Sequence, residues 1–114
     1  MTWRIQVSKS ESKFYDVTQI NSFSHHATIK FRKPHLFGAL IADPFLVAYQ
    51  LRLYIFFETT AYASGIGQIS CLDITENGNY FAEDSINVIA EDFHLAYPCI
   101  CCINGIFYLS LIHI

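Results

Sequence analysis

Apolar residues recur along the chain in short runs of strand length, and none of these runs has the spacing of an amphipathic helix. Seven runs are predicted to be strands: residues 3–7, 14–20, 28–32, 44–49, 53–58, 68–73 and 85–90. The alternation in 28–32 is typical of an exposed strand, whereas the nearly continuous apolar run 44–49 is typical of a strand buried on both faces. Residues 21–26 are predicted to be a loop, and Asn77-Gly78 indicates a β-hairpin turn.

One part of this pattern occurs twice, at a spacing of 54 residues. Three positions are identical in the two copies: Ala42 and Ala96, Pro44 and Pro98, Tyr54 and Tyr108. In each copy a small residue and a proline precede an apolar strand, a turn and an aromatic strand. A period near 50 residues with four strands per unit is typical of β-propeller blades. We therefore expect strands leading into the propeller in 1–41, a complete blade in 42–95 and the start of a second blade in 96–108.

Composition narrows the class of protein. The chain has 114 residues, enough for one domain, and it is 53% apolar and only 15% charged, which excludes intrinsic disorder. The net charge of −3 comes without a basic block, so we expect no nucleic-acid partner. The most apolar run, 100–114, is shorter than a membrane span and contains Asn104, so no transmembrane segment is predicted. The start of the chain does not resemble a signal peptide, and a cytoplasmic location is expected.

Metal and cofactor signals are weak. Four cysteines, Cys71, Cys99, Cys101 and Cys102, lack a second ligand pair at zinc-site spacing and are expected to be buried free thiols. The glycine pair around Ile66 lacks the third glycine and the helix of a dinucleotide-binding loop. We expect neither a metal nor a cofactor.

The last six residues, 109–114, read LSLIHI. They correspond to the translation of the bases CTG TCT CTT ATA CAC ATC, the transposon mosaic end that is used as an adapter in sequencing libraries. We therefore expect 109–114 to be a translated adapter, and His113 enters no functional argument. The alternative is a natural strand that happens to have this sequence.

Several strings in a fixed order carry a family resemblance: 42–46 (ADPFL), 53–58 (LYIFFE), 65–69 (GIGQI), 88–91 (VIAE) and 93–98 (FHLAYP). This series resembles the N-terminal β-propeller domain of glucosamine inositolphosphorylceramide transferases of plants and of many uncharacterised bacterial proteins. That domain is similar to the five-bladed propellers of family-43 glycoside hydrolases. The resemblance implies an all-β fragment, about one and a half blades, of a five-bladed propeller, with the remaining blades missing from this chain.

Three residues are candidates for a carbohydrate site. In a propeller the first strand of each blade lines the central channel. Asp43 precedes such a strand, and Tyr97 is its counterpart one blade later. His94 lies in the loop that enters the same opening of the channel. The resemblance to family-43 hydrolases implies that Asp43 is a catalytic general base, with His94 and Tyr97 binding substrate. The alternatives are a turn-capping Asp43, a His94 that fixes the connection between blades, and a Tyr97 that packs. Glu58 is expected to face solvent or to pair locally.

The function expected from the resemblance is carbohydrate processing or binding, accessory to a glycosyltransferase or a related sugar-modifying domain. The expected partner is a carbohydrate or a glycolipid head group bound by the full-length protein. Two alternatives stay open. The propeller is a non-catalytic scaffold for protein contacts, or the chain is a truncated translation with no activity of its own.

Overall fold

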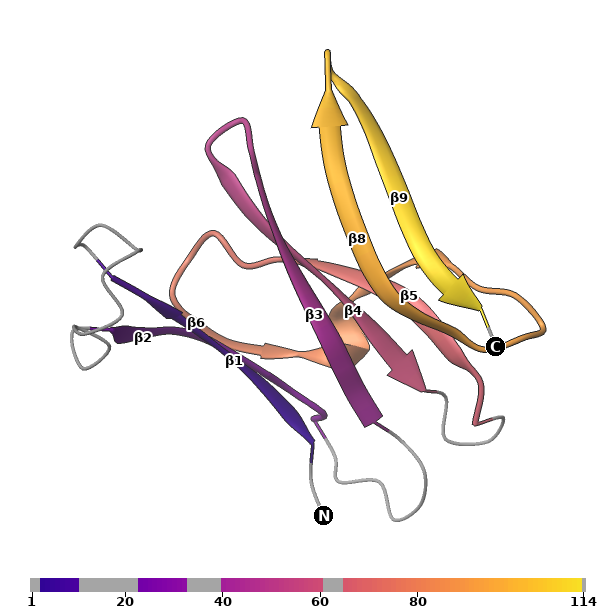
Figure 1. Ribbon diagram of the computed structural model, residues 1–114. Coiled ribbons are helices and arrows are strands. Elements are labelled where there is room, and N and C mark those ends of the chain that lie inside the picture. Colours follow the sequence, from indigo (N-terminus) through magenta and orange to yellow (C-terminus); the bar gives the residue numbers. More distant parts are fainter. Residues whose placement is uncertain (1–2, 11–22, 33–39, 61–64, 114) are drawn as a thin grey trace.

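The computed structural model describes residues 3–10, 23–32, 40–60 and 65–113, and in these the chain is all-β (Figure 1). One short 3-10 turn, η2 (Ala82–Asp84), interrupts the strands. The strands are β1 (Arg4–Lys9), β2 (Ser24–Lys30), β3 (Leu40–Tyr49), β4 (Arg52–Thr60), β5 (Gly67–Asp73), β6 (Gly78–Phe81), β7 (Ile86–Ile89), β8 (Leu95–Ile103) and β9 (Ile106–His113). The all-β prediction is confirmed, and the predicted strand 14–20 lies outside the described residues.

Four of the predicted strands form one antiparallel sheet. Its order is β3-β4-β5-β7, and each neighbouring pair runs antiparallel. The predicted strands 44–49, 53–58, 68–73 and 85–90 correspond to these four strands, although β3 begins earlier, at Leu40, and β7 is shorter than predicted. The expectation that β3 is buried on both faces is wrong, because its residues alternate between half-buried and exposed from Phe45 onward. One face of this strand is open in the described part of the chain.

The 54-residue repeat appears in the structure as two hairpins with the same register. Val47 pairs with Tyr54 in the β3–β4 hairpin, and Cys101 pairs with Tyr108 in the β8–β9 hairpin. Figure 1 shows the two hairpins as long neighbouring ribbons, and β8 packs against β3, β4 and β5. The repeated sequence therefore encodes a repeated antiparallel pair.

The repeated proline explains a break in both ladders. The register shifts between Ala42 and Phe45 in β3 and between Ala96 and Cys99 in β8. Proline has no N–H to donate to the partner strand, so a β-bulge accommodates it. The residue before each proline has a left-handed backbone, with φ of 54° at Asp43 and 57° at Tyr97. The small-residue and proline motif thus marks a bulge inside the strand rather than the start of the strand.

The third sheet has the order β1-β2-β6, in which β2 and β6 are parallel. The hairpin expected at Asn77-Gly78 is therefore wrong, because β6 leaves β5 and pairs with β2, while β7 takes the place beside β5. The loop predicted for 21–26 is also wrong in part, since β2 begins at Ser24. The run 28–32 is exposed only in part, because Thr28 and Ile29 are buried whereas Lys30 and Arg32 are exposed.

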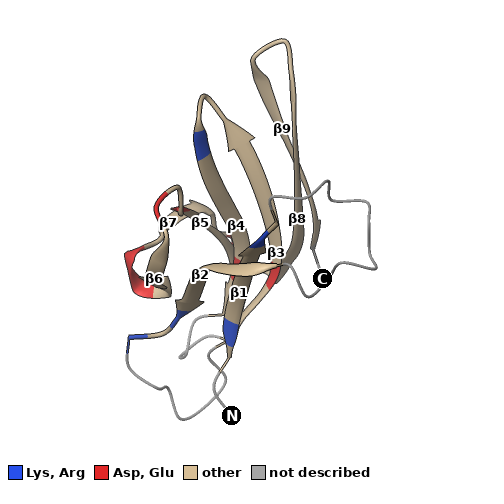
Figure 2. Ribbon diagram, turned by 90° about the vertical axis from the view of Figure 1, so that its left-hand side faces the viewer, with Lys and Arg blue, Asp and Glu red and all other residues tan. Residues whose placement is uncertain are grey.

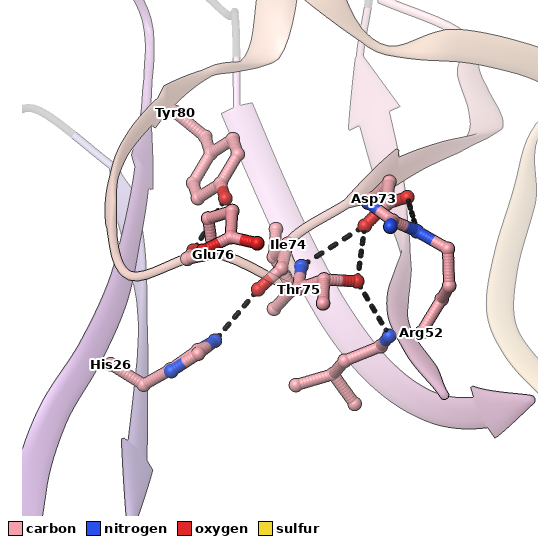
Figure 3. Close-up of polar contacts among 8 residues, drawn as sticks. His26, Arg52, Asp73, Ile74, Thr75, Glu76 and Tyr80 are labelled. Atoms are coloured by element: carbon pink, nitrogen blue, oxygen red, sulfur yellow. Dashed lines mark hydrogen bonds and ion pairs between the residues drawn. The ribbon is translucent and has the colours of Figure 1, made fainter.

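The crossover from β5 to β6 is fixed by side chains of distant segments (Figure 3). The imidazole Nε2 of His26, a buried residue, donates to the carbonyl of Ile74 at 2.7 Å. Asp73 accepts hydrogen bonds from the amide and hydroxyl of Thr75 and pairs with Arg52. These contacts turn the chain away from β5 at Ile74, which a local Asn-Gly signal does not reveal.

The core lies between the β1-β2-β6 sheet and the β3-β4-β5-β7 sheet. Its buried residues are Ile5, Val7, Ala27, Ile29, Ile41, Ile55, Phe57, Leu72, Ile74 and Ala82. Because Ile74 is fully buried in this cluster, the crossover itself belongs to the core. The two sheets are thus joined by a continuous apolar layer.

The cysteines are free thiols. Cys99, Cys101 and Cys102 are exposed, so the expectation that they are buried is wrong. Cys71 on β5 is partly buried, and burial, followed by the charge of Asp73, raises the pKa of its thiol to about 11. Residues 95–113 contain no Lys, Arg, Asp or Glu, and Figure 2 shows β8 and β9 without charged positions.

Candidate functional site

Asp43 lies in the bulge of β3, and its side chain is half-buried. Aspartate tolerates the left-handed backbone better than most side chains do, because its short polar group bonds locally. A bulge changes the direction of the side chains that it contains, and bulges are common beside active sites. The sequence motif before Pro44 thus gives Asp43 an orientation that a regular strand would not allow.

Glu58 on β4 is a buried residue of this site that the sequence did not reveal. It pairs with Ala42 in the strand register, and only 5% of its surface is exposed. The expectation that Glu58 faces solvent is therefore wrong, although the alternative of local pairing holds. Burial raises the pKa of Glu58 to about 7, with further contributions from a hydrogen bond to Asp43 and from the charge of Asp43.

His94, in the segment before β8, contacts the other side of this carboxyl. Its Nε2 lies 3.0 Å from Oε1 of Glu58, and its Nδ1 accepts a hydrogen bond from the backbone amide of Gly67 at 2.9 Å. About a third of the His94 side chain is exposed. The imidazole thus links β4 and β5 at the start of β8.

Gly67 allows this close approach. A Cβ at this position would lie 2.6 Å from the carbonyl oxygen of Leu95, 2.7 Å from Oε1 of Glu58 and 2.8 Å from Cε1 of His94. Separations this short are not seen for real side chains, and the carbonyl belongs to backbone that cannot rotate away. The sequence signal for this site was the glycine pair at the start of β5, Gly65 and Gly67, within the string that carries the family resemblance.

Tyr97 occupies the second bulge, at the position in β8 that matches Asp43 in β3. Its side chain is more than half exposed, and the contacts that join Asp43, Glu58 and His94 do not include it. The structure therefore brings two of the three candidates together through Glu58 and leaves Tyr97 outside this cluster. Their roles in binding or catalysis stay predictions.

Glu58 pairs with Ala42 in the β3–β4 register, next to the bulge that contains Asp43, and the charge of Asp43 contributes to the raised pKa of Glu58. Within the described residues no group of three or more His, Cys, Asp or Glu side chains is arranged to hold a metal ion.

Two open hollows are lined by residues other than Asp43, Glu58 and His94. A cavity of about 280 Å³ between β1 and β3 includes Pro44 in its lining but not Asp43. A second, of about 270 Å³, is formed by apolar side chains of β3, β4 and β5 and by Phe107 of β9. In the described segments no helix has the length and apolar character that a membrane crossing requires.

The fold and the polar cluster define an all-β domain in which repeated hairpins carry one buried acid–histidine group. The chain belongs to the family described as the N-terminal region of glucosamine inositolphosphorylceramide transferase 1, whose sequence model matches residues 9–111. The resemblance seen in the sequence is thereby confirmed at the level of the family. No curated protein and no solved structure matches the chain.

Proposed function

We propose that this chain forms part of a five-bladed propeller that binds a carbohydrate or a glycolipid head group beside a glycosyltransferase domain. The family name associates the chain with a transferase that acts on glucosamine and inositolphosphorylceramide. The meander β3-β4-β5-β7, followed by a second hairpin with the register of β3–β4, supports the propeller part of this proposal. In this proposal β3 and β8 are the first strands of adjacent blades.

The observation that carries the binding proposal is the place of Asp43 in the bulge next to Ala42, the register partner of the buried Glu58, whose carboxyl lies 3.0 Å from His94. A half-buried carboxylate held by neighbours is a fixed acceptor for a sugar hydroxyl, and such oriented polar groups give carbohydrate sites their specificity. In the family-43 hydrolases that the chain resembles, the second carboxyl of the catalytic pair comes from a later blade. Binding is therefore the role we assign to this cluster, and a general-base role for Asp43 requires an acid from another blade.

The second candidate, a protein-interaction scaffold, is favoured by a different observation. The β8–β9 hairpin exposes the large apolar side chains of Ile103, Ile106, Phe107 and Tyr108 and carries no charge. Exposed apolar patches of this kind mark contacts with other protein surfaces. This surface lies on another hairpin than Asp43, so separate variants distinguish the two functions.

The test is calorimetric titration of the protein with D-glucosamine and with myo-inositol 1-phosphate. Asp43→Asn removes the charged acceptor at constant size, and Asp92→Asn is the matched control because Asp92 is exposed near His94. Loss of one charge-assisted hydrogen bond weakens binding by roughly 10- to 100-fold. We expect that loss for Asp43→Asn alone. Equal binding by the wild type and Asp43→Asn, or no binding of either compound by the wild type, contradicts the proposal.

A further inference from the structure

The outer edge of β9 has no partner strand in the described part of the chain. β9 pairs with β8 in a sheet of two strands, whereas β4, the matching strand of the first hairpin, has β5 on its other side. Figure 1 shows β9 on the far side of β8 from β3. The second hairpin therefore has an open edge at the place where the first hairpin continues into its sheet.

The repeat shows which backbone groups of β9 lie on this edge. Leu53 corresponds to Phe107, because each is the second residue after its hairpin turn. The carbonyl of Leu53 accepts a hydrogen bond from the amide of Ile74 at 2.8 Å, and its amide donates to the hydroxyl of Thr75 at 2.9 Å. Backbone groups of every second residue point to the same side of a strand. The amides and carbonyls of Phe107 and Leu109 are therefore directed away from β8.

β9 lacks the features by which proteins protect an open edge. Edge strands are usually blocked by charged residues, proline, a bulge or a short length. β9 has eight residues, of which none is Pro, Lys, Arg, Asp or Glu, and the bulge of its hairpin lies in β8. The side chains of Ile106, Phe107, Tyr108 and Ile112 on this strand are exposed. Such an edge is a template for pairing with a strand of another chain.

The other edge strands of the described sheets each carry one of these protections. β1 has Arg4 and Lys9 at its ends, and β6 and β7 have four residues each. β3 and β8 contain a proline and a bulge. The strand of a second copy that matches β9 in length and in absence of charge is therefore β9 itself.

We propose that β9 pairs with β9 of a second copy in antiparallel orientation, so that the two hairpins form one continuous sheet with the order β8-β9-β9-β8. This pairing has twofold symmetry, the commonest symmetry of protein dimers, and it uses the same edge of both chains. A charged residue near the axis would repel its own copy, and residues 95–113 contain no Lys, Arg, Asp or Glu. The pairing does not depend on the proposed carbohydrate function, and it concerns β9 as this chain carries it, 109–113 included.

Two registers pair almost the whole of β9 and keep Phe107 and Leu109 bonded to the partner strand. In the first, Leu109 lies opposite Leu109 of the second copy. In the second, Ser110 lies opposite Ser110, and the two Leu109 side chains are diagonal neighbours. Opposite Cβ atoms are about 4.5–5.5 Å apart and diagonal neighbours about 7–8 Å apart. A charge introduced at position 109 therefore lies close to its own copy in both registers.

The experiment is sedimentation equilibrium of the full chain over a range of protein concentrations. We expect a reversible equilibrium between monomer and dimer for the wild type. Leu109→Lys and Leu109→Glu are each expected to raise the Kd of the dimer at least about 10-fold, because like charges then face each other. An equimolar mixture of the two variants is expected to recover the dimer, because opposite charges then face each other. Leu51→Lys is the matched control, since Leu51 is fully exposed in the turn of the first hairpin, and it should dimerise as the wild type does.

Three results would overturn the pairing. A wild-type monomer at every concentration would mean that a strand of another protein covers this edge. An open-ended series of larger assemblies would contradict a closed twofold pair. A dimer that neither substitution at position 109 weakens would place the contact between the copies elsewhere.

Should the variants at position 109 fail to fold, amide hydrogen exchange of the wild type decides. The amides of Phe107 and Leu109 are expected to be protected at high protein concentration and to exchange faster on dilution. The amide of Tyr108, which points towards Cys101 of β8, should stay protected at both concentrations. Exchange at Phe107 and Leu109 that does not depend on concentration overturns the pairing.

Discussion

The two repeated hairpins differ in their turns, and this difference predicts a stabilising double substitution. Each turn has two residues with left-handed backbones: Gln50 and Leu51 (φ 49° and 62°) in the first hairpin, Asn104 and Gly105 (φ 53° and 79°) in the second. Two-residue turns of this kind strongly prefer Asn-Gly. We therefore expect the double substitution Gln50→Asn and Leu51→Gly to stabilise the protein.

The expected change in unfolding free energy follows from the contacts and the backbone strain that each substitution removes. Leu51 is fully exposed, so its removal costs no packing. A non-glycine residue in the left-handed region costs roughly 1–2 kcal/mol, and the greater freedom of glycine in the unfolded chain offsets roughly 0.5–1 kcal/mol of the relief. Gln50 contributes a long, exposed hydrogen bond of 3.3 Å to the hydroxyl of Tyr49, whose loss is minor. The net gain is about 1 kcal/mol.

Urea unfolding measures this gain as an increase in midpoint at constant slope. The second hairpin provides the reciprocal control, since Asn104→Gln with Gly105→Leu is expected to destabilise the protein by a similar amount. A double variant at 50 and 51 that is less stable than the wild type would refute the reasoning, because the turn strain would then be absent.

Three further outcomes follow from other contacts. Gly67→Ala is expected to destabilise the protein by about 1–3 kcal/mol in the same unfolding assay, since its Cβ meets immovable backbone; an unchanged midpoint contradicts this. Hydrogen bonds from Arg52 and Thr75, together with the charge of Arg52, lower the pKa of the Asp73 carboxyl from 3.8 to about 2. The ionised carboxylate therefore stabilises the fold above pH 3.8, and this stabilisation is lost as the pH falls towards 2. Asp73→Asn should flatten the stability profile in that acidic interval, and a profile parallel to that of the wild type would argue against the pair. Phe107→Ala removes an edge-on ring contact with Tyr49 at 4.7 Å and should cost at least about 0.5–1.5 kcal/mol of unfolding free energy, whereas Phe107→Tyr should retain most of it.

The hairpins were predictable because their determinants are local and occur twice. Alternating apolar positions, a proline and a turn at a fixed spacing indicate strand pairs without knowledge of the rest of the chain. The division into 1–41, 42–95, 96–108 and 109–114 and the cytoplasmic location stay predictions. The structure places the four-stranded sheet within 40–89 and the second hairpin within 95–113.

The path of β6 was not predictable from its own residues. Asn77-Gly78 has the composition of a hairpin turn, but the burial of Ile74 and the bond from His26 direct the chain to β2. His26 precedes Ile74 by 48 residues, so the determinant is a tertiary contact that outweighs turn propensity. The same limit applies to 28–32, whose alternation gave no sign that β6 pairs with β2.

The site shows how far residue type alone can lead. Asp43 and His94 stood out because of their chemistry and their place around the repeated motif, and in the fold both lie around Glu58. Glu58 did not stand out, because a carboxylate at the end of an apolar strand is usually solvated. Its burial depends on His94, which lies 36 positions further along the chain, and on the missing side chain of Gly67.

The polar cluster is thus an asymmetric feature on a symmetric scaffold. The two bulges have similar φ angles before the proline, 54° and 57°, but one contains Asp43 and the other Tyr97. Glu58 belongs to β4 and His94 lies in the segment before β8, so their contact joins the four-stranded sheet to the second hairpin. Burial of a carboxyl group costs desolvation free energy that an apolar residue at the same position would avoid. Sheet packing alone therefore does not account for an acid at this position. The position of that acid, against the bulge residue with the half-buried carboxylate, is the reason to look for ligand chemistry at Asp43 before any other point on the described surface.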